Sequence, residues 1–155
     1  KIPAQNCKSF MLGDALVEIL SPVTQSNNLN NMSVVLKITY GNTEFLFQGD
    51  AESKIENDLL RSDFDIDVDV LKVGHHGSKT SSTDKYLDAT SPQIAIFSSG
   101  YGNNYGHPNG MILERFEQKG ITAFSTFLNG DITVSSDGKI ITVYTQNNNE
   151  VYQCK

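Results

Sequence analysis

The chain has 155 residues, 38% of them hydrophobic and 19% charged, which suffices for one domain with its own core and excludes a disordered composition. A formal net charge of −6 argues against a broad basic surface for duplex nucleic acid, although bound divalent cations could supply local positive charge. No apolar run is long enough to span a membrane, and the first residues do not resemble a signal peptide. Because residue 1 is lysine rather than methionine, we expect a leader, a tag or a longer N-terminal part to have been removed.

Apolar and β-branched residues predict short strands along the whole chain, each bounded by turn residues. These strands are expected within residues 10–20, 33–40, 43–48, 68–73, 94–97, 121–125, 131–134 and 139–145. Helices are expected between them at residues 51–61, 82–89 and 108–119. The Asn- and Ser-rich segment 24–31 is predicted to be a loop, and the polar tail 146–155 to be frayed or attached to something else.

Strands alternate with helices in the middle of the chain, and antiparallel hairpins flank them. This order predicts a mixed α/β fold, in which helices cover one face of a mixed sheet. We expect residues 1–155 to form a single domain, with a core from about residue 10 to residue 145.

The cysteines and an acidic segment leave alternatives open. Cys7 and Cys154 lie near opposite ends of the chain, so a disulfide and two unrelated free thiols are both compatible with the sequence. Four aspartates between residues 63 and 69 favour a solvated loop ahead of a strand over a metal site.

Polar residues follow three of the predicted strands, at points where glycine lets the chain turn sharply. They lie at residues 48–50, 74–78 and 98–100. In α/β sheets, ligands bind at strand ends, and a buried strand holds the residue just past it on a rigid base. We therefore place the candidate chemistry at these strand ends.

Four residues are the candidates, and each also has a structural interpretation. Asp50 could cap the helix that follows it. His75 and His76 are adjacent at a strand end and point in different directions, so one could bind a metal while the other contacts substrate, or both could be hydrogen-bonded loop residues. His107 precedes a helix N-terminus, where an anion is favoured, or it is a turn residue before Pro108.

Five motifs together resemble the metallo-β-lactamase superfamily and, more narrowly, the C-terminal hydrolase domain of the ComEC/Rec2 DNA-uptake proteins. The matching stretches are NMSVVLKITYG at 31–41, FLFQGDAE at 45–52, DVLKVGHHGSKTSS at 69–82, NNYGHP at 103–108 and NGDI at 129–132. Each motif is weak alone, but their order and spacing are specific, and they span most of the chain. A departure is Phe127, where such relatives tend to carry a polar residue.

The resemblance implies an αββα sandwich, of which this chain would supply one half, the second sheet and its helices. It also implies two divalent ions, zinc or manganese, in the complete protein. Asp50 matches the carboxylate that bridges the two ions, and the histidine pair supplies the last histidine ligand. We favour His76 as the metal ligand and His75 as the residue that contacts substrate. His107 matches a loop histidine that holds a phosphate or donates a proton.

The HxHxDH motif that defines the superfamily is absent from this chain. We therefore expect a partner half that carries it, in the same gene or in a second chain. This chain alone is not expected to hold two metals or to turn over substrate well. By resemblance, the substrate would be DNA or another phosphodiester, and the location extracytoplasmic or at the membrane. The alternative is a non-catalytic fragment, or a module that binds an anion or nucleic acid and needs a partner half.

Overall fold

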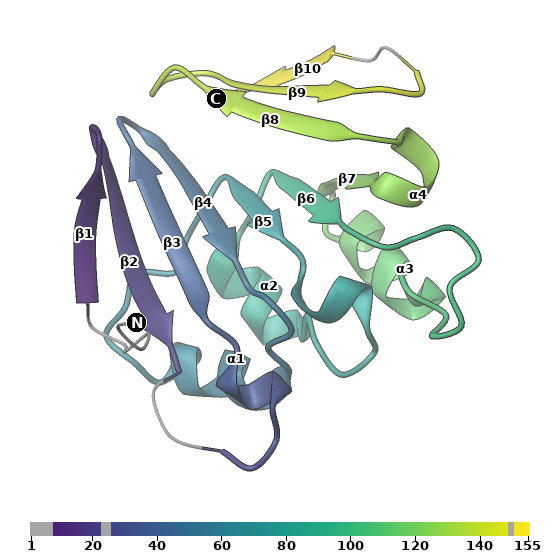
Figure 1. Ribbon diagram of the computed structural model, residues 1–155, viewed down its shortest axis with the longest axis horizontal. Coiled ribbons are helices and arrows are strands. Elements are labelled where there is room, and N and C mark those ends of the chain that lie inside the picture. Colours follow the sequence, from purple (N-terminus) through teal and green to yellow (C-terminus); the bar gives the residue numbers. More distant parts are fainter. Residues whose placement is uncertain (1–7, 23–25, 149–150) are drawn as a thin grey trace.

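A seven-stranded sheet forms the centre of the computed structural model, which describes residues 8–22, 26–148 and 151–155 (Figure 1). Its strands follow one another in chain order: β1 (Lys8–Leu12), β2 (Ala15–Ser21), β3 (Val35–Tyr40), β4 (Thr43–Phe47), β5 (Val70–Lys72), β6 (Ile94–Phe97) and β7 (Thr122–Ser125). The pairs from β1 to β4 are antiparallel, whereas those from β4 to β7 are parallel. The sheet is therefore mixed, as the sequence predicts.

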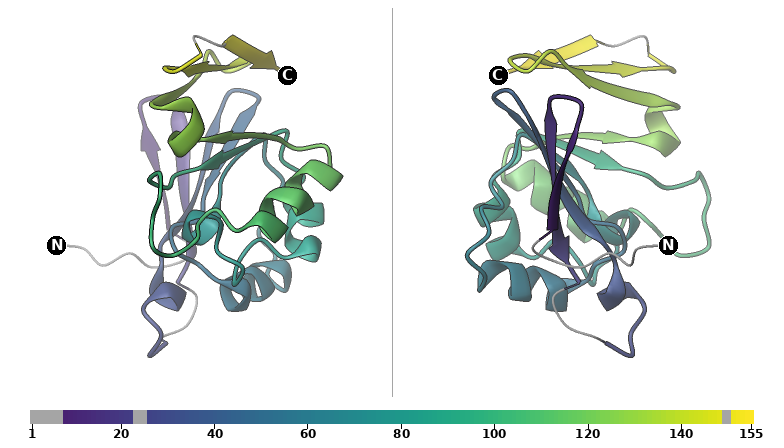
Figure 2. Two further views of the ribbon diagram at one scale, coloured as in Figure 1. Left: turned by 90° about the vertical axis from the view of Figure 1, so that its right-hand side faces the viewer. Right: turned by 60° about the vertical axis from the view of Figure 1, so that its left-hand side comes forward.

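Three helices connect the parallel strands: α1 (Ser53–Leu60), α2 (Asp84–Thr90) and α3 (Gly110–Gln118). Because the strand order never reverses, right-handed crossovers place all three helices on one face of the sheet (Figure 2). Leu46, Leu71 and Ala95 point from the strands to this face and pack with Ile55 of α1 and Phe116 of α3. The mixed α/β fold with helices on one face is thus confirmed.

A second, antiparallel sheet covers the opposite face of β4 to β7. Its strands are β8 (Ile132–Ser136), β9 (Ile141–Thr145) and β10 (Val151–Cys154), and β9 lies in the middle. Val70, Ile94 and Phe124 of the large sheet pack against Ile141 and Val143 of β9. The described residues therefore form three layers, helices on sheet on sheet (Figure 1).

Two hairpin turns join the sheets. Asn42, in the turn between β3 and β4, donates its backbone N–H to Gly138 O at 2.7 Å, and the hydroxyl oxygens of Thr43 and Ser136 lie 2.7 Å apart. Gly41 approaches Gly138 so closely that a Cβ on Gly41 would overlap its backbone. Glycine is required at this contact between the layers.

Two predictions for the ends of the chain were wrong. The single strand expected within residues 10–20 is a hairpin, because Gly13 and Asp14 form a tight turn between β1 and β2. The tail 146–155, expected to be frayed or attached to something else, contains β10, which pairs with β9 of the same chain and packs Tyr152 and Cys154 into the second core. Cys7 lies outside the described residues, so the disulfide and the two free thiols both stay open.

Smaller differences concern element boundaries and the acidic segment. The helix expected to open at Pro108 begins at Gly110, because the Asn109 side chain accepts from Met111 N at 3.1 Å and caps it. Asp69 is buried rather than solvated, and it accepts from Glu44 N at 2.8 Å. A short helix, α4 (Thr126–Asn129), follows β7, and within the described residues no helix has the length and apolarity to cross a bilayer.

Candidate functional site

The carboxyl ends of three adjacent parallel strands bring the candidate residues together. Asp50 follows β4, His75 and His76 follow β5, and Ser98 follows β6. Because parallel strands end at the same edge of a sheet, residues far apart in the sequence become neighbours there. His107 reaches the same edge on the long loop between β6 and α3.

The two adjacent histidines lie in a strained turn, the 3₁₀ segment η2 (Gly74–Gly77). His75 and His76 have backbone φ angles of 47° and 56°, in the left-handed region that non-glycine residues enter at a cost of roughly 1–3 kcal/mol each. His75 N–H donates to Gly49 O at 2.9 Å, and the Ser81 hydroxyl donates to Gly74 O at 2.9 Å. These contacts hold the strained turn beside the end of β4.

A buried polar network lies beneath this turn. Gly74 N–H donates to Gln48 Oε1 at 3.2 Å, and Gln48 Nε2 donates to Glu56 Oε1 at 2.9 Å. The Glu56 carboxylate is fully buried and also accepts the backbone N–H groups of Ser82 and Thr83. One side chain of α1 therefore links the ends of β4 and β5 to the start of α2.

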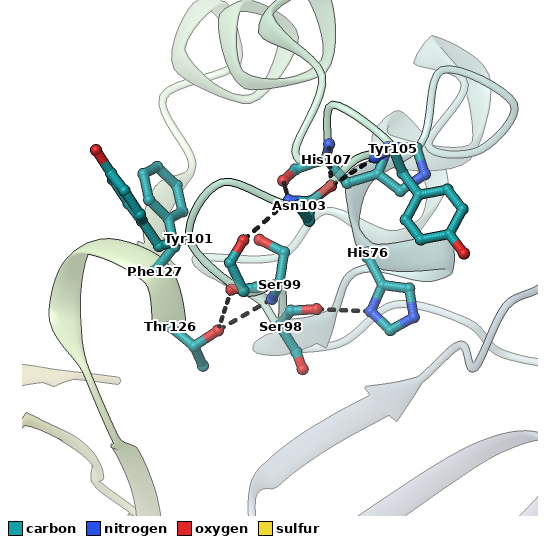
Figure 3. Close-up of a pocket in the computed structure, with 10 residues that line it drawn as sticks. His76, Ser98, Ser99, Tyr101, Asn103, Tyr105, His107, Thr126 and Phe127 are labelled. Atoms are coloured by element: carbon teal, nitrogen blue, oxygen red, sulfur yellow. Dashed lines mark hydrogen bonds between the residues drawn. The ribbon is translucent and has the colours of Figure 1, made fainter.

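Asp50 and His76 form the central pair of the site. His76 Nε2 lies 3.3 Å from Asp50 Oδ1, and both side chains are 47% exposed. His76 Nδ1 lies 2.6 Å from the carbonyl oxygen of Ser98, which can only accept, so the proton is on Nδ1 (Figure 3). In the neutral ring, the Nε2 lone pair then faces a carboxylate oxygen, an arrangement that suits a metal ion bound by both atoms. Asp50 does not cap α1, whose N-cap is Glu52.

A second carboxylate holds the other histidine. Glu52 Oε1 lies 3.5 Å from His75 Nδ1 and accepts from Thr80 Oγ1 at 3.1 Å. Asn28 and Asn30 donate to the same carboxylate at 3.1 and 3.2 Å. Partial burial raises the pKa of Glu52, but the hydrogen bonds of Asn30, Thr80 and Asn28 and the charge of His75 outweigh it, so the pKa lies below its ordinary value. Glu52 is thus an anion that orients His75.

His107 faces the histidine pair from the neighbouring loop. Its ring centroid is 5.6 Å from that of His75, and Tyr105 stacks on it at 6.0 Å. Partial burial and then the charge of His75 lower the pKa of His107, although a backbone hydrogen bond with Gly106 raises it. Its Nδ1 is buried, and no side chain among the described residues bonds to it. A neutral His107 suits a hydrogen bond or proton acceptance better than the holding of a phosphate by charge.

A close backbone contact fixes the loop that carries His107. Gly77 has a φ of 82°, and a Cβ there would lie 2.8 Å from Phe97 Cδ1 and 2.8 Å from Pro108 Cβ. Asn109 N–H donates to Gly77 O at 2.9 Å. The histidine turn and the His107 loop are therefore packed directly against each other.

A cavity of about 570 Å³ opens beside His76 (Figure 3). It is lined by His76, Ser98, Ser99, Gly100, Tyr101, Asn103, Tyr105, His107, Thr126 and Phe127. Its volume lies within the roughly 300–1,000 Å³ that is usual for small-molecule sites.

The described residues fit part of a metal site. Asp50 and His76 offer an oxygen and a nitrogen that converge from two strand ends. Catalytic zinc sites have three protein ligands, and within residues 8–22, 26–148 and 151–155 no group of three His, Cys, Asp or Glu side chains could hold an ion. Further ligands would have to come from outside this part of the chain.

Sequence reasoning singled out the histidines and Asp50, which the structure brings to one edge of the sheet, but missed the groups that orient them. Ser98 acts through its backbone carbonyl, for which a sequence has no signal. Glu52 stands in the quoted FLFQGDAE motif, directly before α1, so its position at the strand end was visible. The burial of Glu56 was not predictable from helix periodicity, because its environment comes from other segments.

No family model matches the chain, but curated relatives do. It is 35% identical over 124 residues to ComE operon protein 3 of Bacillus subtilis (strain 168), covering 79% of this chain and 16% of that protein. It is 38% identical over 115 residues to Competence protein ComA of Neisseria gonorrhoeae, covering 73% and 17%. It is 37% identical over 121 residues to Recombination protein 2 of Haemophilus influenzae, covering 76% and 15%. The chain thus spans about a sixth of the length of these relatives.

Proposed function

Since these relatives support a competence-protein family for this chain, we propose that it is part of a metal-dependent phosphodiesterase of the metallo-β-lactamase type that cleaves DNA during uptake. The observation that carries the proposal is the pair of His76 Nε2 and Asp50 Oδ1 at 3.3 Å, with His76 Nδ1 held by Ser98 O. When one ring nitrogen of a histidine binds a metal, the N–H of the other ring nitrogen usually donates to a carbonyl or carboxylate oxygen, as His76 Nδ1 does here.

Each residue has a role that follows from its position. Asp50 and His76 would hold divalent ions, which lower the pKa of a bound water and stabilise charge on a phosphate. His75, fixed by Glu52 and Thr80, presents its other ring nitrogen to the substrate. His107, with its lowered pKa, accepts a hydrogen bond or a proton. The catalytic residues of this chain are therefore His75 and His107.

The remaining ligands would come from a partner half, and an open apolar face supports this. The strand register puts Phe10, Leu12 and Phe47 on the same face as the second sheet, but beside it rather than beneath it. They are 52%, 65% and 41% exposed. Exposed apolar side chains on one face of a sheet are typical of an interface, and we propose that the partner half packs on this face.

A metal-binding experiment tests the proposal. The protein, with all preceding residues retained, should bind zinc or manganese stoichiometrically and cleave a DNA phosphodiester. Asp50→Ala and His76→Ala should each lower the metal affinity by more than roughly 10–100-fold, which is the usual cost of removing a residue that only hydrogen-bonds to a metal ligand. Asp63→Ala, which removes an exposed carboxylate away from the strand ends, is the matched control.

The competing function is a non-catalytic module in which the loop around residues 100–107 binds an anion. The described residues that line the cavity beside this loop include no lysine or arginine, which disfavours it. Stoichiometric metal distinguishes the two functions. If the protein binds no metal and Asp50→Ala leaves activity unchanged, the hydrolase proposal fails.

A further inference from the structure

The cavity beside His76 has walls of unusual chemistry for a protein that acts on a polyanion. Figure 3 shows Tyr101 and Phe127 at one end and Tyr105 and His76 at the other. Tyr101 and Tyr105 are 88% and 82% exposed, so most of each ring is open to a ligand. Among the described residues that line it, none is Lys, Arg, Asp or Glu. The cavity therefore suits an uncharged, planar group rather than a phosphate.

The loop that carries the tyrosines has a defined shape before any ligand binds. The Asn103 side chain donates to Gly100 O at 2.9 Å and accepts from the N–H groups of Tyr105 and His107, both at 3.1 Å. A Cβ on Gly102 would meet no atom within 4 Å, so the space beside the loop is open. A fixed loop with open space next to exposed rings is a preorganised surface for stacking.

The floor of the cavity is polar and continuous with the candidate metal pair. Thr126 Oγ1 donates to Ser99 O at 2.9 Å and accepts from Ser99 N at 3.0 Å, which joins the end of β6 to α4 (Figure 3). Ser98, the residue before, holds His76. A group bound in the cavity therefore lies next to the side chain that we assign as a metal ligand.

We propose that this cavity binds one unpaired nucleobase next to the phosphate that is cleaved, stacked on Tyr101 or Tyr105, and that the substrate is therefore single-stranded. The inference rests on the proposed function. A base within a duplex is stacked on its neighbours and cannot offer its face to a tyrosine, whereas an unpaired base of any identity can. Because the walls of the cavity are uncharged, we place the phosphate outside the cavity, near His76 Nε2 and Asp50.

Binding without divalent ions tests the inference separately from hydrolysis. The chain is titrated at low salt with EDTA into a labelled single-stranded oligothymidylate, the same strand with one abasic position, and its duplex, and fluorescence anisotropy is read. Low salt is needed because the chain carries a net charge of −6. The intact single strand should bind most tightly, and Tyr101→Leu or Tyr105→Leu should weaken it by roughly 5- to 150-fold, the range for one stacked base.

Tyr144→Leu is the matched control, because Tyr144 is an exposed tyrosine on β9 of the second sheet and does not line the cavity. It should leave the affinity unchanged, and circular dichroism should show all variants folded. Equal affinity for the intact strand and the duplex, no binding of the intact strand, or tyrosine variants that bind as wild type would overturn the inference. Cleavage of DNA by tyrosine variants with unchanged affinity would refute the base site and leave the hydrolase proposal standing. Base-dependent binding in EDTA by a protein that takes up no zinc or manganese in the separate metal titration would support the base site and refute the hydrolase proposal.

Discussion

The buried carboxylate of Glu56 should dominate the stability of the strand ends. Glu56→Ala removes the acceptor of two buried donors, Gln48 Nε2 and the backbone N–H of Ser82, and of the partly buried N–H of Thr83. At roughly 1–3 kcal/mol for each buried donor left without an acceptor, the free energy of unfolding should fall by at least about 2 kcal/mol. That is a large part of the roughly 5–15 kcal/mol that stabilises a typical domain.

Urea denaturation followed by circular dichroism measures this loss. Glu114→Ala is the matched control, because it removes an exposed carboxylate from α3, and it should change the free energy of unfolding by less than about 0.5 kcal/mol. A loss below about 1 kcal/mol for Glu56→Ala would show that water or a relaxed backbone satisfies the three donors, and the reasoning from burial would be refuted.

Two further outcomes follow from the same edge of the sheet. Gly77→Ala should cost about 1–3 kcal/mol in chemical denaturation, because its Cβ would crowd Phe97 and Pro108 at a φ of 82°; a change below about 0.5 kcal/mol would contradict the close contact. Burial and the charge of His75 hold the pKa of His107 below its ordinary value of 6.5, so the unfolded chain binds protons more readily. The free energy of unfolding should therefore fall as the pH drops from 6.5 towards the folded pKa, and His107→Asn should reduce that fall in denaturation curves recorded across this range. An identical pH profile for the variant would refute this.

Local patterns predicted the parts of the fold that depend on neighbours in the sequence. The apolar runs that end at Gly49, Gly74 and Ser98 predicted strands, and parallel pairing places the polar residues after them at one edge. The pairing itself depends on contacts between distant segments, and only the structure supplies them.

The errors lie where distant contacts override a local pattern. Residues 146–155 are mostly polar, yet Tyr152 and Cys154 alternate into a core that other strands provide. The Gly13–Asp14 turn was hidden by the apolar residues on either side of it. In the candidate site, the His76 ring is oriented by a backbone carbonyl, which every residue possesses, so no residue type marks it.

The contact between Gly41 and Gly138 has a consequence for how this protein can change through evolution. The turn after β3 and the turn after β8 belong to different sheets, but each fills the space that the other leaves. A larger residue at position 41 would overlap the backbone of Gly138 and push the layers apart at this corner, whereas one at position 138, where φ is 87°, would strain the backbone of the turn. Loop length elsewhere can drift with little penalty, whereas these two turns must keep their length and their glycines together.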